Sequence, residues 1–153
     1  MLKARTLSSQ NLNGFNFEET KRNVSNFFLG LESLEWEWAK LNAQKGLTAN
    51  YDFELEYRGH PYMKIGTDIF NLSAKELTEE ELKKYISNFY WAKSVLSDVE
   101  QLYLMEYFIH RKYEDEIVDL LGFNNSDSNE FKKLKKSAIF KFADFLNLLV
   151  KKQ

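Results

Sequence analysis

The chain has 153 residues, 44% of them hydrophobic and 16% aromatic, which is enough to bury the core of one domain, with or without a small appendage. One proline, six glycines and no cysteine favour a helix-rich protein and exclude disulfides and thiolate metal sites. The net charge of −2 argues against nucleic acid, yet residues 127–153 carry +4 and residues 1–126 carry −6.

That charge distribution leaves two interpretations. A basic face could approach phosphate while the acidic remainder keeps the chain in solution. The alternative is an ordinary helix with a solvated lysine face, which charge alone favours.

A long helix is predicted after a polar, flexible lead-in over residues 1–16. It begins near residues 17–20 and ends at about residue 44. Gly30 is a weak point inside it, and Trp36 lies off the apolar stripe, where it could face a partner or a second element of the chain. The stripe recurs at spacings of three and four residues and consists of Val24, Phe27, Phe28, Leu31, Leu34, Trp38 and Leu41.

The next segment, residues 49–70, changes to alternating apolar and acidic side chains. Alternation is strand periodicity, so we expect a small β-hairpin around residues 50–66. Such a hairpin is marginal alone and would have to pack on helices, or the segment would remain a mobile connector. We therefore expect an N-terminal part over 1–72 and a C-terminal domain over 73–153, with His60 in the hairpin turn.

Two capping-box spacings open the C-terminal domain. Thr78 with Glu81 predicts the start of one helix, and Ser97 with Glu100 predicts the next, over residues 98–110.

Two further helices follow in the chain. A short acidic helix should stop at Gly122, the residue best suited to a left-handed helix end. A longer basic helix should begin at Asp127, with Glu130 at capping-box spacing.

Helices in this order form the outline of a helix-turn-helix within a mainly α protein. Each helix should bury one apolar face. The predicted buried residues are Val99, Leu102, Tyr103, Met105, Glu106 and Ile109 in the first helix, Ile117, Val118, Leu120 and Leu121 in the second, and Phe131, Leu134, Ala138, Phe142 and Phe145 in the third.

The opposite face of the third helix carries the candidate contacts to DNA. Lysines would neutralise phosphates, polar residues at the helix start would sit at the groove, and Asn129 could read adenine. Arg111, between the first two helices, would contact a backbone phosphate. The candidate set is Arg111, Asn125, Ser126, Ser128, Asn129, Lys132, Lys133, Lys135 and Lys136.

Beyond Ser137 the third helix is apolar almost all round, so this half should be buried. Two explanations stay open, namely packing against the N-terminal helix and a homodimer interface.

Enzyme and membrane motifs are missing. No nucleotide-binding, catalytic or metalloprotease motif occurs, so neither an enzyme nor a cofactor is expected. The acids Glu114, Asp115, Glu116 and Asp119 could in principle bind a divalent ion, but a solvated helix start is the simpler interpretation. No apolar run is long enough to span a bilayer, and no signal peptide is visible.

Several segments resemble the ArpU family of phage and prophage regulators. They are TKRNVSNFFLGLESLEW near the N-terminus, and LSDVEQLYLMEYFI, EIVDLLGF and FKKLKKSAIFKFADFLN in the C-terminal half. The resemblance implies a C-terminal domain like region 4 of sigma factors. It also implies regulation of late genes in the cytoplasm of a bacterial host, with promoter DNA and RNA polymerase as partners. RinA-type activators share the layout, and the turn GFNNSDSN is longer here than is common.

Two other hypotheses remain. One is a helical interaction module that acts on polymerase or a regulator without touching DNA. The other is a phage small terminase subunit, which also uses helix-turn-helix units on phage DNA.

Overall fold

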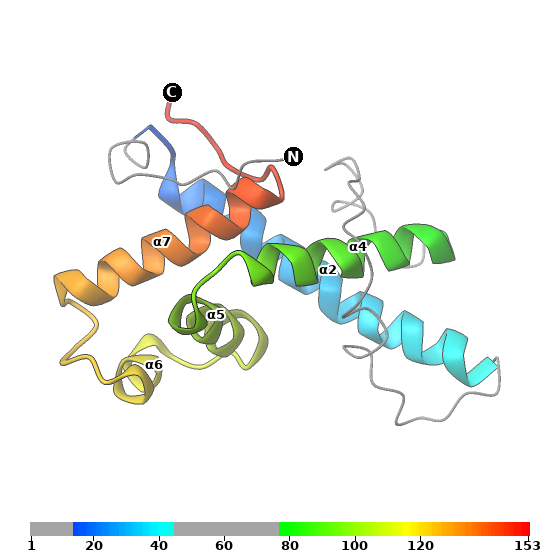
Figure 1. Cartoon of the computed structure of the whole chain (residues 1–153), viewed down its shortest axis with the longest axis horizontal. Helices are drawn as coiled ribbons and strands as arrows, with labels where there is room; N and C mark the ends of the chain where they lie inside the picture. Colours follow the sequence, from blue (N-terminus) through cyan, green and yellow to red (C-terminus); the bar gives the residue numbers. More distant parts are fainter. Residues whose placement is uncertain (1–13, 45–76) are drawn as a thin grey trace. The chain divides into compact units, whose positions relative to one another are not determined.

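The computed structural model describes residues 14–44 and 77–153, and the regular elements in these ranges are helices (Figure 1). The protein is mainly α, as the composition predicted. The elements are α2 (Phe17–Gln44), α4 (Glu79–Ser94), α5 (Asp98–Leu104), the π-helical turn η3 (Met105–Ile109), α6 (Glu114–Leu121) and α7 (Asn129–Phe145).

Some sequence predictions lie outside the described residues. They are the hairpin around residues 50–66, the domain boundary at 72–73, His60 and the side chains of Trp36, Trp38 and Leu41.

Contacts divide the chain into two compact units. We call residues 26–44 with 77–92 the middle unit, and residues 14–25 with 93–153 the terminal unit. The first turns of α2 and the last residues of α4 therefore belong to the terminal unit.

In the middle unit, aromatic side chains of α2 and α4 form the core. Phe27 and Tyr85 stack with ring centroids 4.8 Å apart, and the Tyr85 hydroxyl donates a 2.7 Å hydrogen bond to the Phe27 carbonyl oxygen. A Cβ at Gly30 would meet the Tyr85 hydroxyl. The glycine that weakens the helical pattern is therefore required by the close approach of Tyr85. Burial raises the pKa of Tyr85 well above its usual range.

The start of α4 confirms the first predicted capping box. Thr78 Oγ1 accepts from the Glu81 amide at 3.2 Å, and Glu81 Oε1 accepts from the Thr78 amide at 3.0 Å. These reciprocal bonds satisfy two amides that the first helical turn leaves without partners.

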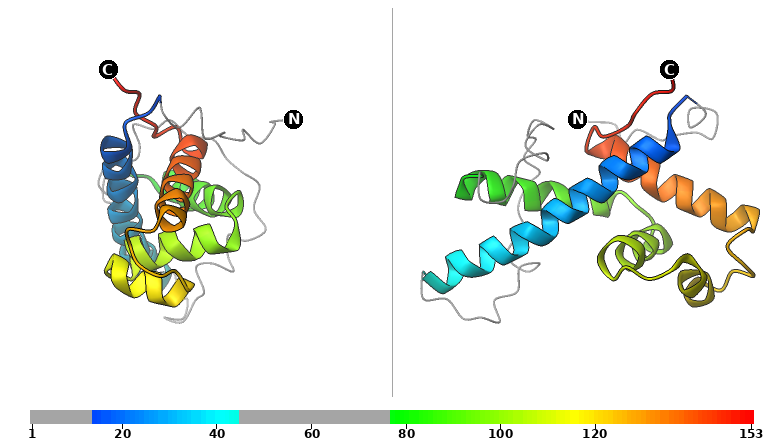
Figure 2. Two further views of the ribbon diagram at one scale, coloured as in Figure 1. Left: turned by 90° about the vertical axis from the view of Figure 1, so that its left-hand side faces the viewer. Right: turned by 180° about the vertical axis from the view of Figure 1, so that it is seen from behind.

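In the terminal unit, α7 crosses α5 and α6 steeply. Figure 1 shows α5 and α6 close to end-on while α7 runs across the view. In the turned view at the left of Figure 2, α5 and α6 run across the view and α7 stands upright and foreshortened. A short helix, a turn and a steeply crossed longer helix are compatible with a helix-turn-helix.

The predicted stop of α6 is confirmed. Gly122 has a left-handed φ of 81°, the Gly122 amide donates to the Asp119 carbonyl, and the Phe123 amide donates to the Val118 carbonyl at 3.0 Å. The Phe123 ring then packs on Phe131 of α7, with centroids 5.6 Å apart. The connection after α6 is thus anchored to the core at its first residues.

The predicted N-cap of α7 is wrong by one residue. Ser128 is the N-cap, with an extended backbone and a hydroxyl that accepts from the Phe131 amide at 3.2 Å. The Asp127 amide instead donates to Asn125 Oδ1 at 2.9 Å, which holds Asp127 inside the preceding turn.

The predicted buried face of the helix over residues 98–110 is confirmed only in part. Tyr103 and Glu106 are buried as predicted and Met105 is half-buried, but Val99, Leu102 and Ile109 are exposed, and Leu104, which was not predicted, is buried. The helix is rotated from the predicted orientation because Glu100, its capping acid, faces α7.

The predicted buried faces of α6 and α7 are closer to the structure. In α6, Ile117 and Val118 are buried as predicted, but Leu120 is exposed and Leu121 is half-buried. In α7, Phe131, Ala138 and Phe142 are buried as predicted, and Leu134 and Phe145 are half-buried.

Residues 14–16 were predicted to be part of a flexible lead-in, but they pair with residues near the other end of the chain. Phe15 forms a β-bridge with Lys151, and the Asn16 amide donates to the Val150 carbonyl at 2.6 Å. Further along, the Val150 amide donates to Thr20 Oγ1 at 3.1 Å, and Asn23 Nδ2 donates to the Leu148 carbonyl at 3.1 Å. We call these contacts between residues 14–23 and 148–152 the terminal clasp.

Candidate nucleic-acid interface

Helix α7 divides at Ser137 into an exposed half and a buried half. In the first half Asn129, Lys132, Lys133 and Lys136 are exposed, whereas in the second half Ala138, Ile139, Phe140, Phe142 and Ala143 are all buried. Apart from Lys141 and Asp144, which are half-buried, the second half of α7 is apolar and covered on several sides.

Packing within the chain explains part of this burial. The Phe140 ring lies against Phe15 and Phe17, with centroids 6.2 Å and 5.7 Å apart. Of the two explanations left open by the sequence, packing against the N-terminal helix therefore accounts for Phe140.

Lys135 differs from its three neighbours. Its Nζ lies 2.8 Å from Glu114 Oε1 of α6 and 5.6 Å from the centroid of the Phe17 ring. Only 21% of its side chain is exposed. Lys135 thus joins α7 to α6 and to the start of α2, whereas Lys132, Lys133 and Lys136 extend into solvent.

The polar candidates before α7 lie in the connection over residues 122–128. Asn125 is exposed and its side chain shapes the turn, Ser126 is half-buried, and Ser128 caps α7. Asn129, the first residue of α7, is exposed beside the lysines. The structure therefore brings Asn129 onto the same face as Lys132, Lys133 and Lys136.

Arg111 lies away from α7 in sequence, in the connection between η3 and α6. It is exposed and has a left-handed φ of 55°, a conformation that is uncommon for residues other than glycine, asparagine and aspartate.

A small ionic cluster holds the end of η3 beside Arg111. Lys112 Nζ lies 2.8 Å from Glu106 Oε2, and His110 Nδ1 lies 3.0 Å from Glu106 Oε1. The hydrogen bond from Lys112 lowers the pKa of Glu106, and the same contact raises the pKa of Lys112.

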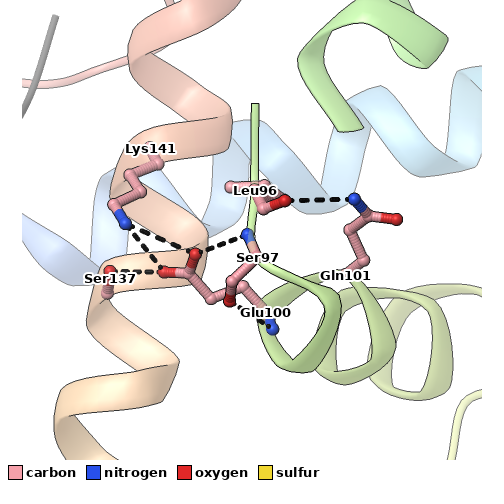
Figure 3. Close-up of polar contacts among 6 residues, drawn as sticks. All are labelled: Leu96, Ser97, Glu100, Gln101, Ser137 and Lys141. Atoms are coloured by element: carbon pink, nitrogen blue, oxygen red, sulfur yellow. Dashed lines mark hydrogen bonds and ion pairs between the residues drawn. The ribbon is translucent and has the colours of Figure 1, made fainter. Parts of the chain in front are cut away.

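A buried polar cluster around Glu100 fixes α5 against α7 (Figure 3), and no spacing pattern in the sequence predicts its long-range contacts. Glu100 is 4% exposed. Its Oε1 accepts from the Ser97 amide at 2.9 Å and from Lys141 Nζ at 3.3 Å, while its Oε2 accepts from the Ser137 hydroxyl.

Burial by itself raises the pKa of Glu100, but the hydrogen bonds from Ser137 and Ser97 and the charge of Lys141 outweigh it. The pKa of the carboxyl group is therefore below its usual value. Glu100 is a positioning residue, because it sets where α7 lies relative to α5.

The aromatic core behind the lysine face is formed by Tyr103, Tyr107 and Phe131. Tyr103 stacks on Tyr107 with centroids 5.7 Å apart and meets Phe131 edge-on at 5.8 Å. Burial raises the pKa of Tyr103 well above its usual range. A Lys21 ammonium 4.9 Å above the Tyr107 ring adds a contact from α2.

Acidic residues gather on the outer side of α6, where Asp115, Glu116 and Asp119 are exposed. Among residues 14–44 and 77–153, no group of three or more histidine, aspartate or glutamate side chains is placed to hold a metal ion. The helices in these ranges include none both long and apolar enough to cross a membrane.

Comparisons with protein-family models, with curated proteins and with solved structures found no match to this chain.

Proposed function

We propose that the protein is a DNA-binding transcriptional regulator of the ArpU type, acting on phage or prophage late genes through a sigma region 4-like helix-turn-helix. The observation that supports this most is the exposed face of α7 formed by Asn129, Lys132, Lys133 and Lys136. The other side of the same helix is anchored by buried Phe131 and Ala138. A helix held on one side with cations on the other suits entry into the major groove.

Within this proposal the lysines contact phosphate and Asn129 lies at a base edge. The amide of an asparagine can bind adenine through two hydrogen bonds. Lys135 takes no part in phosphate binding, because its ammonium is held by Glu114. Arg111, which lies outside α7, would make a further contact with a phosphate of the DNA backbone.

The test first identifies the DNA and then measures binding. The full chain is used to capture fragments of the host and phage genomes, which are sequenced. Affinity for a recovered fragment and for a mixed-sequence duplex is then measured by fluorescence anisotropy across a salt series.

Lys132→Gln with Lys136→Gln should weaken binding to both duplexes by about tenfold or more and reduce the salt slope by about two units, because each phosphate contact contributes about 0.9. Lys151→Gln with Lys152→Gln is the matched control, since these exposed lysines lie in the C-terminal tail. Equal effects of the two double variants, with the fold intact by circular dichroism, would refute the proposal.

Other outcomes point to the two alternatives. Capture of a packaging region by a ring-shaped oligomer would indicate a small terminase subunit. Absence of any salt-sensitive DNA binding would favour a protein interaction module, whose apolar interface responds weakly to salt.

A further inference from the structure

The exposed charges of α6 and α7 are sorted by sign, unlike those of α4. In α4, acids and lysines one turn apart pair within the helix, with Lys83 Nζ 3.9 Å from Glu79 Oε1 and Lys84 Nζ 3.7 Å from Glu80 Oε1. Helix α6 contains acids but no lysine or arginine, and the exposed face of α7 carries three lysines. The charges of these two helices therefore cannot be balanced in the same way.

Two pairs of like charges result from this sorting. Asp115 and Asp119 are exposed one turn apart on α6, and Lys132 and Lys136 are exposed one turn apart on α7. We call them the acid pair and the lysine pair. Like charges at this spacing destabilise the helix that carries them. None of the four side chains forms a hydrogen bond or an ion pair with another described residue, so neither repulsion is relieved within that part of the chain.

The acid pair and the lysine pair match in spacing as well as in sign. Residues four apart are separated by about 6 Å along a helix, so two helices lying side by side can bring each carboxylate to one ammonium. Leu120, next to Asp119, is 52% exposed and offers an apolar surface to the methylene stems of lysines. A contact of this kind would relieve both repulsions at once.

Within one copy the two pairs do not meet. There α6 and α7 are joined on other sides of the helices, where Lys135 Nζ lies 2.8 Å from Glu114 Oε1. Adjacent residues of a helix lie about 100° apart around its axis, so the contact through Glu114 turns Asp115 away from α7. A contact between the acid pair and the lysine pair therefore has to be made between molecules.

We propose that the acid pair of one copy binds the lysine pair of a second copy of this chain. The charges select a second copy because every copy carries both halves of the contact in equal number. The lysine pair also belongs to the face proposed to bind DNA, and the acid pair offers it two anionic groups, as phosphates do. Self-association and DNA binding should then exclude each other. This exclusion rests on the proposed function, whereas the association itself does not.

The contact is small and exposed to solvent, so salt should control it. The first measurement is sedimentation of the full chain without DNA, at concentrations up to about 1 mM. The mass should exceed that of the monomer at about 20 mM salt and fall to the monomer at about 300 mM, where charges on the surface are screened. A chain that is monomeric at both salt concentrations, or equally associated at both, would overturn the proposal.

Charge reversal tests whether these two faces form the contact. Asp115→Lys with Asp119→Lys, and Lys132→Glu with Lys136→Glu, should each weaken association at low salt about tenfold or more, because each brings like charges together. The variant with all four substitutions has the net charge of the wild type. It should regain association, since the pairs form again with their signs exchanged.

Glu18→Lys with Glu19→Lys is the matched control. It makes the same change in net charge as the reversal of the acid pair, at two exposed acids in the first turn of α2. It should weaken association far less. Equal losses in these two variants would rule out the contact, as would a fourfold variant that is folded by circular dichroism but associates no better than either double variant.

Amide chemical shifts of the wild type locate the contact without any substitution. When the chain is concentrated at low salt, shifts should change at the acid pair and at the lysine pair. A DNA duplex should reverse the changes at the acid pair, which lies outside the proposed DNA face. If no DNA binds, the proposed function fails while the association stands. If DNA binds and the changes at the acid pair persist, the exclusion is wrong.

Discussion

At the scale of single residues, Glu100 connects the two helices that matter most for the proposed interface. Its carboxylate caps α5 through the Ser97 amide and also accepts from Ser137 and Lys141 of α7. Hydrogen bonds to a charged, buried acceptor are among the stronger ones in proteins. The position of α7 therefore depends on the charge of one side chain.

Glu100→Gln should lower the free energy of unfolding at neutral pH by about 1–3 kcal/mol. The folded-state pKa of Glu100 lies below its ordinary value of 4.5, so its contribution is complete above that pH and is lost as the pH falls through the folded value. The difference between wild type and variant should therefore be constant near neutral pH and shrink below about pH 4.5. Urea unfolding at several pH values measures it.

Glu130→Gln is the control for this experiment. Glu130 is an exposed acid in the first turn of α7. The difference in unfolding free energy between Glu130→Gln and the wild type should therefore be the same at every pH. A Glu100→Gln deficit that grows as the pH falls would contradict the assigned direction of the pKa.

Residue patterns predicted the local part of this cluster and missed the rest. The three-residue spacing of Ser97 and Glu100 was sufficient for the capping box, because both partners are neighbours in the chain. The bonds from Ser137 and Lys141 cross 37 and 41 residues, and no periodicity encodes such a pairing. For the same reason the rotation of α5 could not be predicted from its apolar spacing.

At the scale of helices, the four lysines before Ser137 in α7 separate into two roles. Lys135 points to Glu114 and the Phe17 ring, while Lys132, Lys133 and Lys136 are exposed. On a helix, side chains one residue apart lie about 100° apart, so adjacent lysines need not share a surface. The sequence identified the basic helix correctly as an element but could not tell its inward lysine from its outward ones.

Lys135→Gln should lower the free energy of unfolding by about 0.5–1 kcal/mol, because it removes a partly exposed ion pair and a contact with an aromatic ring. It should leave the salt slope of DNA binding unchanged. Chemical unfolding and anisotropy titrations across a salt series measure the two effects separately.

Lys132→Gln should give the opposite pattern, with unchanged stability and a salt slope reduced by about one unit. If Lys135→Gln reduced the slope as much as Lys132→Gln does, Lys135 would be a phosphate contact after all.

At the scale of the whole molecule, the terminal clasp joins segments from distant parts of the sequence. Thr20 is fully buried, and its hydroxyl oxygen accepts from the Val150 amide. No pattern in the sequence predicts this pairing. The pairing depends on backbone amides, which are not particular to any residue type. The elements could be predicted from the sequence, but this arrangement of their ends could not.

Thr20→Val should lower the free energy of unfolding by about 1–3 kcal/mol, because the Val150 amide loses its acceptor while the side-chain volume is kept. Hydrogen exchange should become faster at the Val150 and Asn16 amides, which are both hydrogen-bonded in the clasp. Thr20→Ser keeps the acceptor and should retain most of the protection. Undisturbed exchange in Thr20→Val would show that the hydroxyl does not hold the tail.

The clasp also determines when the terminal unit can be completed during synthesis. Thr20 and Val150 are 130 positions apart, so a ribosome adding residues at ordinary speed makes the second on the order of 10 s after the first. Throughout that interval the first turns of α2 lack their final partners. Completion of this unit therefore waits until residues 148–152 have been made, and a chaperone that shields nascent helices would act on the start of α2 before it could act on α7.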